Sequence, residues 1–218
     1  MELQEILQKV DHTLLKPTAT IKEIEELVED AIKYNTASVC IPPCYVNDVK
    51  KKYGDSVRIC TVIGFPNGYN STKVKVYEAK QAIKDGADEI DMVINIGDLK
   101  AKKYTKVKNE VKKLRQVTEG KILKVIIETC LLNEREKIKM CKIVSEVGAD
   151  YIKTSTGFST EGATFKDIKL FRQYLSKDVK MKAAGGISSL EDAEEFINLG
   201  CDRLGTSKIV NIAKELDK

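Results

Sequence analysis

The segment Gly148-Ala-Asp-Tyr-Ile-Lys-Thr-Ser-Thr-Gly157 contains the pattern that decides the fold of this chain. Here a Gly-x-Asp group ends a helical stretch and leads into a short apolar strand, and the same group recurs at Gly86 and Gly200. A glycine in this position predicts a left-handed backbone conformation just past a helix end. The recurrence indicates a weak internal repeat of one βα unit.

Short runs rich in valine and isoleucine alternate with longer, amphipathic, charge-rich stretches along the whole sequence. This rhythm predicts strands near residues 10–15, 37–41, 58–64, 89–95, 123–128, 151–155, 180–185 and 203–206. Four helix starts are predicted by sequences that resemble capping boxes, namely Thr20-x-x-Glu23, Asn133-x-x-Glu136, Thr164-x-x-Asp167 and Ser188-x-x-Glu191.

Eight strands that are each followed by a helix predict an α/β fold, a (β/α)8 TIM barrel formed as a single domain by residues 1–218. No Pro/Ser-rich linker or low-complexity segment interrupts the pattern. A doubly wound open sheet is the alternative. The barrel is favoured because the inward-facing side chains of a closed sheet meet in one interior, whereas an open sheet would spread them over two faces.

The composition is that of a globular protein, with 42% hydrophobic and 32% charged residues. The 37 basic and 33 acidic residues leave a net charge of only +4, without a motif for nucleic acid. No stretch approaches the roughly 18 apolar residues of a membrane helix, and the first residues lack the order of a signal peptide. We therefore expect a cytoplasmic protein without a nucleic-acid or membrane partner.

The six cysteines are scattered without C-x-x-C spacing, and the chain has one histidine, His12. Buried free thiols in a reducing compartment are therefore expected in preference to disulfides or a metal site. His12 lies in a strand and is expected to be a hydrogen-bonded packing residue. Cys40, before Pro42-Pro43, could react with an unsaturated aldehyde near the barrel mouth, but an inert apolar role is favoured.

Three charged residues lie within predicted buried strands: Lys153, Lys182 and Asp91. Alternate residues of a strand share a face, so Lys180, Lys182 and Ala184 are expected to point inward together. Asp91 lies opposite the apolar face of its own strand. These side chains predict a polar cluster inside an otherwise apolar core, which Asp11 or Thr13 could support.

A buried lysine tends to lose its proton, and a neutral amine attacks carbonyl carbon to form a Schiff base. Lys153 is the candidate nucleophile, Lys182 is expected to lower the pKa of Lys153 by repulsion, and Asp91 would transfer protons. None of these steps needs a metal or an organic cofactor. The alternative is an ion network that only supports the barrel, although such networks stabilise proteins poorly.

Glycine-rich turns follow the seventh and eighth predicted strands, at Ala184-Gly-Gly-Ile187 and Arg203-Leu-Gly-Thr-Ser207. In many barrels these two loops bind a phosphate through backbone amides and a helix N-terminus. A tight turn would explain either glycine pattern alone. The two loops in this order favour a phosphorylated substrate.

The motifs resemble those of the deoxyribose-phosphate aldolases, class I enzymes that reversibly split 2-deoxy-D-ribose 5-phosphate into acetaldehyde and D-glyceraldehyde 3-phosphate. The resemblance covers nearly the whole chain, with the motifs in order: Asp11-His-Thr-Leu-Leu-Lys-Pro17, Val39-Cys-Ile-Pro42, Gly86-Ala-Asp-Glu-Ile-Asp91, Lys124-Val-Ile-Ile-Glu-Thr129, Tyr151-Ile-Lys-Thr-Ser-Thr-Gly157, Lys182-Ala-Ala-Gly-Gly186 and Gly205-Thr-Ser207.

The resemblance implies the (β/α)8 barrel, a role in deoxynucleoside breakdown and homodimers. It implies that Lys153 forms the Schiff base, that Lys182 lowers the pKa of Lys153 and assists proton transfer, and that Asp91 relays protons through water. It also implies a phosphate site formed by Gly157, Gly185, Gly186, Gly205 and Ser207. The chain departs from the family pattern at Lys208, where a small residue is frequent, and the sequence assigns this lysine no role.

Two other functions remain open at this stage. One is a lysine-dependent aldolase for another sugar phosphate, which would prefer a larger donor than acetaldehyde. The other is a non-catalytic barrel that binds a phosphosugar without forming an imine.

Overall fold

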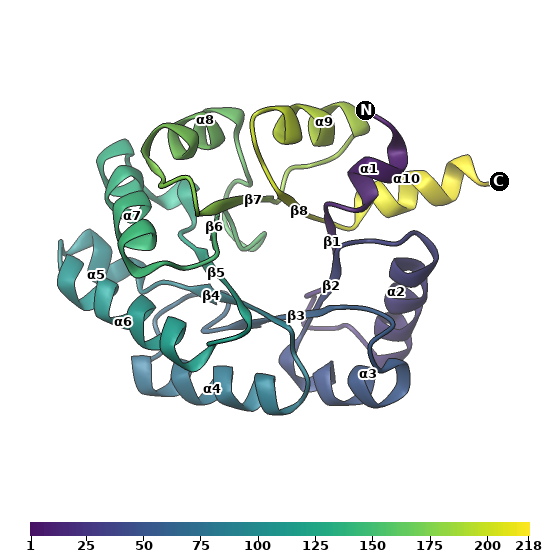
Figure 1. Ribbon diagram of the computed structural model, residues 1–218, viewed down its shortest axis with the longest axis horizontal. Coiled ribbons are helices and arrows are strands. Elements are labelled where there is room, and N and C mark those ends of the chain that lie inside the picture. Colours follow the sequence, from purple (N-terminus) through teal and green to yellow (C-terminus); the bar gives the residue numbers. More distant parts are fainter.

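The computed structural model describes residues 1–218, and its strands close into a parallel barrel in which each strand pairs with its neighbours in the sequence (Figure 1). The strands are β1 (Val10–Thr13), β2 (Ser38–Ile41), β3 (Ile59–Ile63), β4 (Glu89–Val93), β5 (Ile122–Ile126), β6 (Tyr151–Lys153), β7 (Lys180–Ala184) and β8 (Arg203–Thr206). Pairing of β1 with β8 closes the ring. The predicted barrel is therefore confirmed, and the open sheet is wrong.

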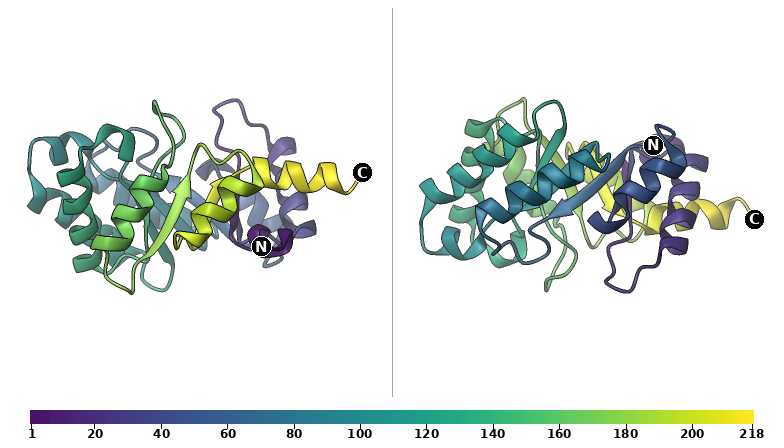
Figure 2. Two further views of the ribbon diagram at one scale, coloured as in Figure 1. Left: turned by 90° about the horizontal axis from the view of Figure 1, so that it is seen from above. Right: turned by 90° about the horizontal axis from the view of Figure 1, so that it is seen from below.

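The helices surround the barrel on its outside (Figures 1 and 2). They are α1 (Leu3–Leu7), α2 (Ile21–Lys33), α3 (Val46–Tyr53), α4 (Thr72–Lys84), α5 (Ile96–Lys100), α6 (Tyr104–Val117), α7 (Glu134–Val147), α8 (Phe165–Tyr174), α9 (Leu190–Asn198) and α10 (Lys208–Leu216). The amino group of Met1 pairs with Glu194 on α9 at 2.8 Å, which places the start of the chain beside the last helices. None of the helices has the length and apolar character needed to cross a lipid bilayer.

The local predictions hold closely, because all eight strands lie within two residues of their expected ends. Reciprocal capping boxes form at Thr20 and Asn133, whereas Thr164 caps α8 with its own side chain alone. The predicted start at Ser188 is wrong by one residue, since Ser189 accepts from the amide of Asp192 and is the N-cap of α9. The amide and hydroxyl of Ser188 instead donate to the Asp192 carboxylate.

The glycines of the three Gly-x-Asp groups all have positive φ angles, 109° at Gly86, 71° at Gly148 and 101° at Gly200. This conformation lets the backbone leave the helix and enter the next strand with little strain. The prediction from the repeated unit is therefore confirmed.

The main apolar core lies between the strands and the helices. On β4, Ile90 and Met92 belong to this core, while Glu89 and Asp91 are buried on the other face of the strand. On α2, the buried positions Ile24, Leu27, Val28 and Ala31 repeat with the spacing of one helix face. Burial of each such large aliphatic side chain contributes about 1.5–3 kcal/mol. The outer layer thus supplies much of the stability, and the lumen of the barrel is left for charged groups.

Candidate active site in the barrel lumen

A network of charged side chains fills the lumen. It consists of four cationic groups and three carboxylates, all buried: Lys124, Lys153, Lys182, Arg203, Asp11, Glu89 and Asp91. When all are ionised, the network therefore contains one cation in excess. Isolated charges are strongly disfavoured in such an interior, so their mutual contacts determine which groups can stay charged.

Asp91 lies at the centre of this network. Its Oδ1 accepts from Lys124 Nζ at 2.8 Å, and its Oδ2 accepts from Lys153 at 2.7 Å and from Lys182 at 2.9 Å. Register explains the convergence, because Asp91 is paired with Lys124 across β4 and β5, and Lys153 with Lys182 across β6 and β7. Burial alone would raise the pKa of Asp91, but the three ammonium groups lower that pKa well below its usual range.

Lys124 and Lys182 are held as ammonium ions. Burial opposes the charge of Lys182, yet Asp11 and Asp91 together raise its pKa above the usual value. The pKa of Lys124 is also raised despite burial, by Asp91 first and by further groups that include Glu89, whose carboxylate lies 2.6 Å away. Each of these lysines therefore has at least two carboxylate partners.

Lys153 differs from the other cations in two respects. Its only carboxylate contact is the Oδ2 atom of Asp91, which it shares with Lys182. It is also the one member of the network that lines the large cavity at the carboxyl ends of the strands. Lys182 and Asp91 lie deeper in the lumen, while Lys180, on the same face of β7, is exposed at the start of that strand.

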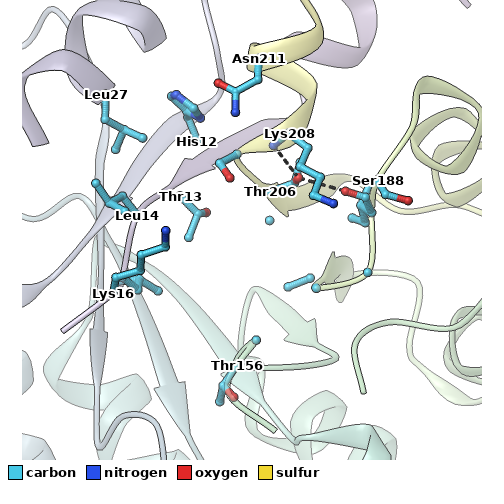
Figure 3. A pocket seen from close by; sticks show the side chains of 18 of the residues that line it. His12, Thr13, Leu14, Lys16, Leu27, Thr156, Ser188, Thr206, Lys208 and Asn211 are labelled. Carbon is cyan, nitrogen blue, oxygen red and sulfur yellow. Dashed lines mark hydrogen bonds between the residues drawn. The ribbon is translucent and has the colours of Figure 1, made fainter. Parts of the chain in front are cut away.

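The cavity has a volume of about 570 Å³, which is within the usual range for small-molecule sites. Its wall contains all five residues expected at a phosphate: Gly157, Gly185, Gly186, Gly205 and Ser207. Figure 3 shows how Thr156, Ser188, Thr206 and Lys208 surround the same space.

The glycine turn after β7 has φ angles of 74° at Gly185 and 76° at Gly186. Gly162 packs directly against this turn, so that a Cβ atom at residue 162 would collide with the carbonyl of Gly185. The amide of Ala163 donates to the carbonyl oxygens of Ala184 and Gly185, both at 3.1 Å. The loop after β6 therefore supports the loop after β7, a role for Gly162 that the sequence did not predict.

Two lysines at the cavity have no ion-pair partner. Lys16 and Lys208 line the wall without a carboxylate within 4.0 Å, whereas Lys214, also at the wall, pairs with Asp30 at 2.8 Å. Lys208 is the first residue of α10, and its N-cap Ser207 makes no capping hydrogen bond. The Lys208 amide donates to Thr206 Oγ1 at 3.1 Å, so the remaining first-turn amides and the positive end of the helix dipole lie next to a free ammonium group.

His12 borders the same cavity between α2 and α10 (Figure 3). It is only 2% exposed, and neither ring nitrogen has a hydrogen-bond partner. Burial lowers the pKa of His12 to about 4, so the ring is neutral near pH 7. The burial expected for His12 is therefore confirmed, while the backbone of Thr206 is the polar group that acts on its ring without a hydrogen bond of standard geometry.

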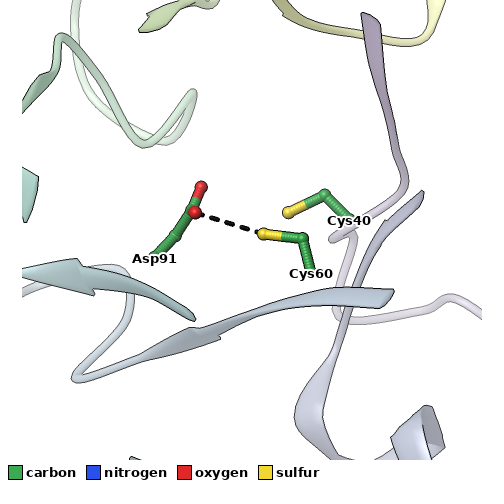
Figure 4. Close-up of side chains that lie close together, drawn as sticks. All are labelled: Cys40, Cys60 and Asp91. Carbon is green, nitrogen blue, oxygen red and sulfur yellow. Dashed lines mark hydrogen bonds between the residues drawn. The ribbon is translucent and has the colours of Figure 1, made fainter. Parts of the chain in front are cut away.

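Cys40 does not reach the cavity wall, and it lies buried beside Cys60 and Asp91 in the lumen (Figure 4). The two sulfur atoms and an Asp91 oxygen lie within 4.8 Å of one another and could supply metal ligands. Both Asp91 oxygens, however, already accept from ammonium groups, and a divalent cation would have to compete with three positive charges. We therefore assign Asp91 to the lysine network.

Three members of the network were not identified as site residues from the sequence: Glu89, Lys124 and Arg203. A charged residue in the apolar run Ile122-Leu-Lys-Val-Ile126 is the same signal that identified Lys153. Asp11 joins the network as expected, through Lys182 and Arg203. Thr13 contributes less, since its hydroxyl donates to the backbone oxygen of Asp11 at 2.7 Å.

A closed (β/α)8 barrel with buried lysines below a cavity at its carboxyl end is typical of barrel enzymes that act on carbonyl compounds through an amine. The particular family follows from comparison with known proteins. The chain belongs to the DeoC/LacD family of aldolases, whose family model matches residues 5–199.

Individual relatives agree with this assignment over nearly their whole length. A deoxyribose-phosphate aldolase of Clostridium botulinum (strain Alaska E43 / Type E3) is 60% identical over 214 residues, which cover 98% of this chain and 97% of the relative. The enzyme of the same name from Clostridioides difficile (strain 630) is 53% identical over 215 residues, covering 99% and 98%.

Solved structures show the same architecture. One aldolase has a TM-score of 0.92 at 42% identity, covering 97% of this chain and 96% of the other. The deoxyribose phosphate aldolase of Aeropyrum pernix, described as tetrameric, has a TM-score of 0.87 at 30% identity, covering 99% and 93%.

Proposed function

We propose that this aldolase reversibly cleaves 2-deoxy-D-ribose 5-phosphate to acetaldehyde and D-glyceraldehyde 3-phosphate through a Schiff base on Lys153. The observation that supports Lys153 most directly is its position. It alone among the four lumenal cations meets the cavity, and it alone has a single carboxylate contact. Loss of its proton would also remove the excess positive charge of the network.

In the cleavage direction, the amine of Lys153 attacks the aldehyde carbon C1 and forms a carbinolamine. Loss of water gives an iminium ion, which draws electrons from the C2–C3 bond as that bond breaks. The proton of the C3 hydroxyl leaves to a base, and D-glyceraldehyde 3-phosphate departs. The remaining enamine takes up a proton at carbon, and water then hydrolyses the imine to release acetaldehyde and the free amine.

Lys182 and Asp91 would move the protons of these steps. The Lys182 ammonium can protonate the departing hydroxyl of the carbinolamine, while Asp91, within 2.7 Å of Lys153, can accept a proton directly or through water. We assign no metal or organic cofactor a role in this sequence of steps.

The substrate phosphate would bind at the loops after β6, β7 and β8. Backbone amides of Gly157, Gly186 and Gly205, with the hydroxyl of Ser207, would act as donors near the start of α10. Gly185 would line the site, while its amide donates to the carbonyl of Gly205 at 3.5 Å. The wall position of Lys208 is consistent with an added electrostatic contribution.

We further propose that residues 1–218 act as one catalytic domain in the cytoplasm, and that the protein forms a homodimer. All six cysteines are free thiols, which suits a reducing compartment; four are buried as expected, whereas Cys44 is exposed and Cys130 is half-buried. Gel filtration with light scattering tests the dimer, and a monomeric mass would refute it.

Borohydride trapping with acetaldehyde tests the proposed function. An imine on Lys153 should be reduced to an ethyl adduct, which intact and peptide mass analysis would locate on that residue and which the Lys153→Ala variant should lack. A chelator should not change turnover. Absence of an adduct in folded protein that binds the phosphosugar would favour a non-catalytic barrel, whereas a strong preference for dihydroxyacetone phosphate as donor would indicate another aldolase.

A further inference from the structure

Glu128 is a buried carboxylate at the mouth of the barrel that has no cationic partner. It is 2% exposed and makes no salt bridge, unlike the carboxylates of the lumenal network. Its two oxygens accept from the amide of Thr156 at 3.2 and 3.3 Å and from the hydroxyl of Thr156. A buried carboxylate without a counter-ion is costly, so this arrangement calls for a functional explanation.

The backbone holds Glu128 in this position at a cost. Its φ of 53° and ψ of 70° lie in the left-handed region, which is unusual for a residue other than glycine. The flanking amides of Ile127 and Thr129 donate to the carbonyl oxygens of Lys153 and Thr154, at 3.1 and 2.9 Å. The end of β5 is thus fixed against β6, with the carboxylate of Glu128 directed at Thr156.

This contact determines the hydrogen-bonding character of Thr156, whose side chain lines the cavity (Figure 3). A hydroxyl has one donor and two acceptor sites, and the Thr156 hydroxyl donates to Oε2 of Glu128 while the Thr156 amide donates to both oxygens of the same group. The hydroxyl proton of Thr156 is therefore committed to Glu128. The amide of Phe158 donates to the same oxygen at 3.1 Å, which leaves one acceptor site for a ligand.

We infer that Glu128 is a positioning residue for substrate specificity. By binding the hydroxyl proton of Thr156, it leaves Thr156 Oγ1 as a hydrogen-bond acceptor in the cavity wall. This oxygen selects an aldehyde substrate that carries a hydroxyl group. This inference rests on the proposed function. In the synthetic direction, the selected compound is a 2-hydroxyaldehyde phosphate, and its hydroxyl donates to Thr156 Oγ1. An analogue without the hydroxyl would leave a buried acceptor unsatisfied, which corresponds to about a tenfold to hundredfold loss in kcat/KM.

The experiment compares two acceptors with acetaldehyde as donor: D-glyceraldehyde 3-phosphate and its deoxy analogue, 3-phosphooxypropanal. In the wild type, kcat/KM should favour the hydroxylated aldehyde by about tenfold to hundredfold. In Glu128→Gln, the amide can donate to Thr156 Oγ1, so the hydroxyl is no longer forced to act as an acceptor, and the ratio should fall close to one. Thr156→Val should show the same low ratio, whereas the matched variant Thr156→Ser should keep the wild-type preference.

Inhibition by inorganic phosphate serves as the control for loop integrity and should be the same in all four proteins. If Glu128 had a merely structural role, Glu128→Gln would lower kcat/KM for both aldehydes and weaken inhibition by phosphate at the same time. That result overturns the inference. An unchanged acceptor ratio in Glu128→Gln also overturns it. If that variant does not fold, equal ratios in Thr156→Val and Thr156→Ser overturn it instead. Absence of turnover by the wild type on either aldehyde would refute the proposed function itself.

Discussion

Lowering the pH from 7 toward 4 is expected to destabilise this protein because its single histidine is buried without a proton. The pKa of an unfolded histidine is about 6.5, whereas burial lowers the pKa of folded His12 to about 4. Between these values the unfolded chain binds more protons than the folded protein at this residue. The free energy of unfolding must therefore fall as the pH falls through this range.

The size of the effect follows from the two pKa values. Each pH unit between them changes the free energy of unfolding by about 1.4 kcal/mol. Protonation of His12 in the unfolded chain therefore lowers this free energy by about 2 kcal/mol at pH 5 and by about 3 kcal/mol once the pH is below 4. Asp11 and Asp91 do not interfere in the upper part of this range. Their pKa values are lowered in the folded state, so their contribution is complete above the unfolded value near 3.8 and is lost only as the pH falls below it.

Urea denaturation followed by far-UV circular dichroism, at intervals between pH 5 and 7.5, measures this loss; tyrosine fluorescence provides a second probe because the chain has no tryptophan. His12→Gln is the matched control, since glutamine is polar and does not titrate. The wild type should lose about 2 kcal/mol more than this variant between pH 7.5 and 5. Equal pH dependence in the two proteins, or an imidazole NMR resonance that titrates near 6.5, would refute the reasoning.

Three further changes test the site. Lys182→Leu should lower kcat by about 10²–10⁴-fold, because it removes the ammonium group proposed to protonate the departing hydroxyl of the carbinolamine. An unchanged kcat would contradict that role. Gly162→Ala should displace the turn at Gly185 and reduce kcat/KM for the phosphosugar by about 10–100-fold, while imine trapping with acetaldehyde persists; unaltered KM would argue against loop support. Lys208→Ser should raise the KM for the phosphosugar about fivefold, which corresponds to roughly 1 kcal/mol, and should make that KM less dependent on salt. Steady-state kinetics at two ionic strengths test this prediction, and an unchanged KM would contradict it.

The fold was predictable because every strand has one face that meets a helix. On β4, the apolar residues Ile90 and Met92 alternate with the charged residues Glu89 and Asp91. This alternation predicts both that the segment is a strand and which of its faces meets the helices. The start of α9 was missed by one residue because Ser188 and Ser189 are both capping residues by type. Only the position of the Asp192 amide distinguishes them.

The site was predictable to the extent that a charge stands out in an apolar strand. Lys153 and Asp91 have this signal, but the sequence does not state which strands become neighbours across the lumen. The contacts of Arg203 with Asp11 and Glu89 depend on closure of the ring. Gly162 and Glu128 had no signal of their own, because their roles arise from a second loop that packs against them.

The arrangement of charge supports the proposal that Lys153, of the three lumenal lysines, forms the Schiff base. Lys124 and Lys182 each contact two or more carboxylates, so loss of a proton from either lysine weakens more ion pairs than loss of a proton from Lys153, which contacts only Asp91. Removal of the proton from Lys153 leaves Asp91 with two ammonium partners and removes the excess cation. A buried ion network contributes little to stability, and the apolar layer between the strands and the helices supplies most of it instead. The network therefore places the one cation with a single carboxylate contact, the lysine proposed to form the Schiff base, where the cavity begins.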